Sequence, residues 1–136
     1  MEIDFLDAAG RHRADAEFLF EHERWPNADQ LYGFAAECGL KAVMMALGMP
    51  VDARGVPSRH RMHIDRLWDA FGGFAEGREA GHLAGYLGEN PFPDWNVSQR
   101  YQSTASISPS AVEEHRRGTD IVFRLVAQVR LDGRLT

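Results

Sequence analysis

The sequence is poor in several features that mark particular classes of protein. It has one cysteine, Cys38, and therefore no internal disulfide; a reduced thiol in a cytoplasmic protein is expected. No apolar run reaches the roughly 18 residues of a membrane span. The acidic, amphipathic start of the chain does not have the pattern of a signal peptide. These absences predict a cytoplasmic protein that does not enter a membrane.

Short motifs of common catalytic and metal sites are also missing. The sequence contains no H-x-x-x-H or C-x-x-C spacing, no glycine-rich phosphate loop after a strand, and no G-x-S-x-G. A net charge of -5 argues against binding nucleic acid through bulk positive charge. We therefore expect no metal and no cofactor, and any site has to be sought in individual side chains.

Lysine is almost absent as well, because Lys41 is the only one among 15 basic residues. It lies in the stretch 29–48, where apolar residues recur at helical spacing without proline, which predicts a long, buried central helix. Asp29 is expected as its N-cap, and Gly48 as its end. Glu37 and Lys41 share its narrow polar face at the i,i+4 spacing of an ion pair. A stripe of small residues predicts close approach by another helix: Ala35, Gly39, Ala42 and Ala46.

The remainder of the 136 residues fits a single domain with further helices. Trp25-Pro26-Asn27 is expected to end the first helix, and Gly72-Gly73 the third. The start of the last helix is predicted either by Ser108 as the cap with Pro109 in the first turn, or by a capping box of Ser110 and Glu113. Residues 88–108 predict a long irregular loop. We therefore predict an all-α, up-and-down bundle of four to five helices, with helices at about 2–24, 29–48, 58–71, 76–87 and 108–131.

Three segments resemble motifs of HEPN domains. The central YGFAAECGLKAVMMALG, with its E-x-x-L-K-A core at 37–42, resembles the second helix of that family. His63 to Leu67 matches the H-x-x-x-L segment that opens the next helix, and WNVSQRY at 95–101 is similar to a Trp…Arg-Tyr segment before the last helix. The three occur in the family's order over about residues 3–131. The resemblance implies a helical bundle that forms a homodimer.

Many HEPN members are metal-independent RNases with an Arg-x(4-6)-His motif near the start of the last helix. Here Arg100 is followed by no histidine until His115, and the only nominal match, Arg54 with His60, lies in a proline- and glycine-containing loop. The resemblance therefore points to those members that bind nucleotides or small molecules, or that act as partners of nucleotidyltransferases, including those of bacterial toxin–antitoxin and defence systems.

Five residues are predicted to line a cleft between the central helix, the start of the third helix and the long loop: Glu37, Lys41, His63, Arg100 and Tyr101. Lys41 would offer charge to an anion while Glu37 orients it. His63 is a candidate general acid or base, since histidine ordinarily titrates near about pH 6.5. Arg100, beside aromatic residues, would stack on a base or hold a phosphate. Each also has a structural reading, as an ion pair, a helix-start hydrogen bonder or a loop anchor.

Three functions remain open from the sequence. The leading hypothesis is a binding protein for a nucleotide or another anionic small ligand. The second is a metal-independent RNase in which His63 or His60 is the acid or base and Arg100 contacts the phosphate. The third is a structural partner subunit without a site of its own.

Overall fold

The structure is a computed structural model that describes residues 1–135, and it confirms the predicted all-α helical bundle. Within these residues the only β pairing is an isolated bridge between Val51 and Pro57. Four α-helices and three short 3-10 helices follow in the order α1 Phe5–Glu21, α2 Trp25–Ala46, α3 Ile64–Glu76, η1 Gly81–Tyr86, η2 Val97–Tyr101, η3 Thr104–Ser106 and α4 Pro109–Leu131.

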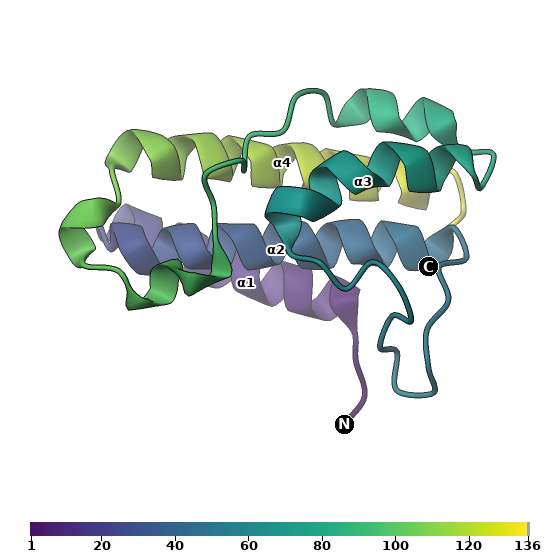
Figure 1. Ribbon diagram of the computed structural model, residues 1–136, viewed down its shortest axis with the longest axis horizontal. Coiled ribbons are helices and arrows are strands. Elements are labelled where there is room, and N and C mark those ends of the chain that lie inside the picture. The colour runs from purple at the N-terminus through teal and green to yellow at the C-terminus, as the bar shows by residue number, and fades with distance from the viewer. Residues whose placement is uncertain (136) are drawn as a thin grey trace.

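Helix α2 is the centre of the bundle, and α1, α3 and α4 all pack against it (Figure 1). Helix α1 is antiparallel to α2, as expected for two helices joined by a short turn. Two long connections, 47–63 and 77–108, return the chain along the bundle (Figure 1). Helix α4 runs in the direction of α2, with His115 beside Asp29 and Val122 beside Gly39. Helix α3 starts beside Glu37 in the second half of α2 and runs in the same direction (Figure 1). The helices therefore do not alternate in direction as the predicted up-and-down order requires.

The junction between α1 and α2 differs from the sequence prediction. Trp25-Pro26-Asn27 does not end the first helix; it forms the first turn of α2, where proline is tolerated because the first N–H groups of a helix have no intrahelical partner. Helix α1 already ends at Glu21. Asp29 is therefore not the N-cap of α2, and it lies buried inside the helix instead.

The third and fourth predicted helices also need correction. His60 has a left-handed backbone with φ 56, so α3 cannot begin at 58–60 and starts at Ile64. It also continues through Gly72-Gly73, because Phe71 and Phe74 on either side are buried in the core. That packing outweighs the roughly 1 kcal/mol that each glycine costs in a helix. The segment predicted as a short fourth helix forms only the 3-10 helix η1.

The small-residue stripe of α2 has the predicted role. A Cβ added at Gly39 would lie 2.8 Å from Val122 Cγ1 of α4, so only glycine allows this approach. Gly33 has an equivalent role on another side, where the indole ring of Trp95 occupies the space of a side chain. At both glycines, close packing offsets the helix propensity that glycine loses.

The start of α4 is as predicted, with Ser108 accepting a hydrogen bond from the backbone N–H of Ala111 and Pro109 in the first turn. The connection before it is irregular apart from the 3-10 helices; of these, η2 packs against α2 and is capped by Asn96. Among residues 1–135 no helix has both the length and the apolar character that crossing a membrane requires.

Candidate functional site

The structure brings together three of the five predicted site residues. The Glu37 carboxylate joins the other two, with Oε2 2.9 Å from Lys41 Nζ and Oε1 2.9 Å from His63 Nδ1. An ionised carboxylate only accepts hydrogen bonds, so His63 donates from Nδ1. The remaining ring nitrogen, Nε2, belongs to a side chain that is 44% exposed.

Two helices fix this arrangement. Glu37 and Lys41 are one turn apart on α2, in the order that favours an i,i+4 pair. His63 is the N-cap residue of α3, but its ring makes no capping hydrogen bond there because it is committed to Glu37. Lys41 is nearly enclosed, with 8% of its side chain exposed, so Glu37 neutralises a charge that burial would otherwise penalise.

Aromatic and titratable side chains surround the carboxylate. The His63 ring centroid lies 6.4 Å from that of Trp95, and Phe34 packs between Trp95 and His12 of α1. Burial and the charge of Arg11 lower the pKa of His12, while Glu37 acts in the opposite direction. His12 was not among the predicted site residues.

Cys38, next to Glu37 in the sequence, is partly buried. Burial, followed by the Glu37 charge, raises the pKa of its thiol to about 11. A thiol with this pKa is a poor nucleophile at neutral pH, in agreement with its assignment to the core pattern.

Arg100 and Tyr101 do not join the other three residues in these contacts. Arg100 donates to the backbone oxygen of Val97 at 2.7 Å and stacks on Tyr101, which is 77% exposed. Gln30 of α2 reaches the same oxygen of Val97. Gln30 lies seven residues before Glu37, which corresponds to about 10 Å along the helix. The arginine and tyrosine therefore belong to the end of the bundle where α2 begins.

A second polar cluster, absent from the sequence prediction, lies closer to that end. Its centre is His115 of α4, only 2% exposed, with Nδ1 2.5 Å from Asp29 Oδ1 and Nε2 2.8 Å from Asp94 Oδ1. Gln99 donates to the second carboxylate oxygen of Asp29. Phe92 stacks on the imidazole. We call these four polar residues the His115 cluster: Asp29, Asp94, Gln99 and His115.

The geometry of the His115 cluster fits a protonated imidazole. Both ring nitrogens face carboxylate oxygens, and both must donate for the two hydrogen bonds to exist together. Burial lowers the pKa of His115, but hydrogen bonds and charge from Asp29, and then from Asp94, outweigh it, and the pKa is raised above its ordinary value. A sequence signal exists, because His115 shares helical spacing with the buried Thr119, Val122 and Val126.

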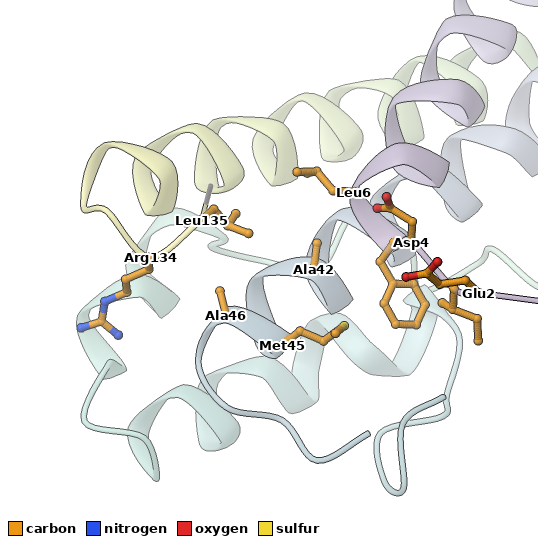
Figure 2. Close-up of a pocket in the computed structure, with 10 residues that line it drawn as sticks. Glu2, Asp4, Leu6, Ala42, Met45, Ala46, Arg134 and Leu135 are labelled. Carbon is orange, nitrogen blue, oxygen red and sulfur yellow. The ribbon is translucent and has the colours of Figure 1, made fainter. Parts of the chain in front are cut away.

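A surface hollow lies apart from the group formed by Glu37, Lys41 and His63. It has a volume of about 330 Å³ and is open between the first residues of the chain, the end of α2 and the C-terminal residues. Figure 2 shows Glu2 and Asp4 on one side of it and Arg134 on the other. Phe5 also lines it, and the centroid of its ring lies 5.9 Å from Lys41 Nζ. Two carboxylates at its edge make this hollow a poor place for an anion.

No family model, curated protein or solved structure matches this chain. The resemblance to HEPN domains therefore stays a prediction, as do the homodimer and the nucleotidyltransferase partner that it implies. Among the side chains of residues 1–135, no three His, Cys, Asp or Glu residues group as a metal site needs.

Proposed function

We propose that this chain binds a small phosphate-bearing anion, such as a nucleotide, at the exposed ring nitrogen of His63. One observation carries the proposal: a single carboxylate, Glu37, fixes both Lys41 Nζ and His63 Nδ1 and leaves His63 Nε2 free on an accessible side chain. A histidine held through one nitrogen presents the other in a fixed direction. In its protonated form that nitrogen donates a charge-assisted hydrogen bond to phosphate.

The charges around His63 favour an anion. Lys41 neutralises Glu37, so the pair adds no net charge to the site. Arg59, Arg61 and Arg66 flank His63 in the sequence and are exposed, and no ion pair within residues 1–135 involves them. A local excess of positive charge in a protein of net charge -5 favours encounter with anionic ligands at this surface.

The residues have separate roles in this proposal. His63 contacts the ligand directly. Glu37 orients the imidazole, and Lys41, which is enclosed, acts through Glu37 as a positioning residue. Arg100 and Tyr101 take no part, because their contacts lie toward the start of α2.

The test is a titration of the purified protein with AMP and, separately, with inorganic phosphate, followed by the ¹⁵N resonances of the histidine rings. We expect Nε2 of His63 to shift and His63→Ala to weaken AMP binding about tenfold or more, since a charge-assisted hydrogen bond contributes about 1.5–3 kcal/mol. Lys41→Met should weaken binding less while the helical circular dichroism spectrum is kept.

His82→Ala is the matched control, because His82 is an exposed histidine on η1, outside the site. Its AMP affinity should equal that of the native protein. An unshifted His63 resonance, or equal affinity in His63→Ala, would overturn the proposal.

Metal-independent RNA cleavage is the second candidate, favoured by the same carboxylate–histidine pair. A carboxylate that orients an imidazole is the arrangement used when histidine acts as a general base. This candidate predicts that an RNA oligonucleotide is cleaved in the presence of EDTA, and that His63→Ala abolishes the cleavage. Intact RNA with the native protein would eliminate it and leave ligand binding unaffected.

A further inference from the structure

The connection between α3 and α4 is tied to the bundle through the His115 cluster. Asp94 belongs to this connection, and its carboxylate reaches His115 although 65% of the side chain is exposed. Behind the imidazole, Asp29 of α2 holds the other ring nitrogen and also accepts from Gln99 of the same connection. Through this cluster the connection is thus held by two residues, Asp94 and Gln99, and Asp94 is exposed to water.

The same connection carries Trp95, which forms a wall of the His63 site. Trp95 follows Asp94 directly; its indole N–H donates to the backbone oxygen of Asp29 at 3.0 Å, and its ring fills the space over Gly33. Its other neighbours are Phe34 and His63. Movement of Asp94 away from His115 would therefore loosen the side chain that packs beside His63.

The hydrogen bonds from His115 to Asp29 and Asp94 can both exist only while the imidazole is protonated. A neutral imidazole donates from only one nitrogen, and its other nitrogen repels a carboxylate that it faces. Asp29 is buried and keeps Gln99 as a second donor, whereas Asp94 regains water easily. Loss of the proton should therefore release Asp94 first.

The charged residues on either side of His115 in α4 are already paired, and Glu89 of the connection lines the hollow at Asp94 and makes no ion pair within residues 1–135. On α4, Glu114 pairs with Arg117, and Arg116 makes a two-pronged ion pair with Glu17 of α1. Asp29 from α2 and Asp94 from the connection are the carboxylates that hydrogen-bond the ring. The protonation of His115 is thus coupled mainly to these two carboxylates.

We propose that His115 and Asp94 form a proton-controlled latch that holds Trp95 beside His63 and thereby regulates the anion site. The latch is closed while His115 is protonated and opens as the pH rises. The hydrogen bonds from His115 to Asp29 and Asp94 outweigh burial and raise its pKa, so the closed state persists to higher pH than an ordinary histidine would allow. The regulatory part of this inference rests on the proposed function; the latch itself does not.

The direct reporter is the exchange of the Trp95 indole N–H with solvent, measured by NMR between pH 6 and 9 and corrected for intrinsic exchange. We expect its protection to fall about tenfold or more as His115 deprotonates. The Trp68 indole, bonded to the Gly88 backbone oxygen, should stay protected. Asp94→Asn keeps the shape and removes the charge, and it should move the midpoint down by about one pH unit.

Glu89→Gln is the matched control, because Glu89 is an exposed carboxylate of the same connection that lines the same hollow as Asp94. Its midpoint should equal that of the native protein. Protection of Trp95 that does not change with pH, or an unchanged midpoint in Asp94→Asn, would overturn the latch.

AMP affinity separates this inference from the proposed function. At a pH between the midpoints of the native and Asp94→Asn proteins, we expect Asp94→Asn to bind AMP several-fold more weakly, and Glu89→Gln to bind it normally. Equal affinity in all three proteins would overturn the regulation and leave the proposed function standing. No AMP binding to the native protein would overturn the proposed function and with it the regulation, while indole exchange would still decide the latch.

Discussion

Two histidines meet carboxylates of α2, and they differ in how many ring nitrogens are engaged. His115 is 2% exposed and hydrogen-bonded through both nitrogens, to Asp29 and Asp94. His63 is 44% exposed and bonded through one, to Glu37. Asp29 and Glu37 are eight residues apart, so the two clusters are centred about 12 Å from one another along the same helix.

The difference separates a structural network from a site. When every polar atom of a buried network has a partner, the network fixes one arrangement and has no free donor or acceptor for a ligand. Glu37 and Lys41 form such a satisfied pair, but His63 extends it to the surface and ends in an unused nitrogen. Function is therefore expected where the hydrogen-bond network is incomplete and accessible.

The largest effect should come from Asp29→Asn, which tests whether the buried cluster is the structural one. Asparagine removes the charge that balances the buried imidazolium and turns one of the two acceptors into a donor facing His115 or Gln99. Breaking a buried ion pair from one side costs about 3–5 kcal/mol. Urea unfolding followed by circular dichroism at pH 7 measures this loss.

Glu37→Gln is the comparison for that measurement. The amide oxygen of glutamine still accepts from Lys41 or from His63, so the loss should be about 1–3 kcal/mol. If Asp29→Asn cost no more than Glu37→Gln, the distinction between the two clusters would fail.

Gly33→Ala should have the next largest effect, because Gly33 lets Trp95 link the two clusters. A methyl group there would lie 2.0 Å from Trp95 Cε2, so the indole must move away from the Asp29 oxygen and from His63. We expect a loss of about 1–3 kcal/mol of unfolding free energy from overpacking, together with fast exchange of the Trp95 indole N–H.

Gly10→Ala is the matched control on α1, where a Cβ meets nothing within 4 Å. It should raise the unfolding free energy by about 0.5–1 kcal/mol through helix propensity alone. A Gly33→Ala protein that is as stable as the native one and keeps a protected Trp95 indole would contradict the proposed link.

The sequence predicts the bundle well because its helices are amphipathic and strongly periodic. The i,i+4 pair of Glu37 and Lys41 and its position on a narrow polar face follow from the same periodicity. So does the close approach of another helix to Gly39, although only the structure shows that this helix is α4. The start of α4 follows from the chemistry of Ser108 and Pro109. These features depend on neighbours within one helix, which a sequence displays directly.

Features that depend on distant segments are the ones the sequence misses. Gly72-Gly73 have the sequence pattern of a helix end, but α3 continues through them because Phe71 and Phe74 are buried in the core. Asp29 has the pattern of a cap, and only the folded chain shows that it is buried against His115, 86 positions away. His63 hydrogen-bonds Glu37, whereas the place of Arg100 depends on how the connection folds over the start of α2.

The smallest effect is expected from His12 of α1, a third histidine to compare with His63 and His115. Burial and Arg11 lower its pKa, so the unfolded chain takes up a proton more readily than the folded one, and stability should fall as the pH drops below about 6.5. His115 contributes in the opposite direction, since its raised pKa stabilises the protonated fold and this contribution is lost as the pH rises through the folded value.

His12→Gln should therefore lose less stability than the native protein between pH 6.5 and 5.5, by under about 1 kcal/mol because the side chain is partly solvated. Parallel urea curves at the two pH values measure the difference, with His82→Gln as the control that should follow the native protein. The same loss in all three proteins would contradict a lowered pKa of His12, because its environment would then favour neither protonation state.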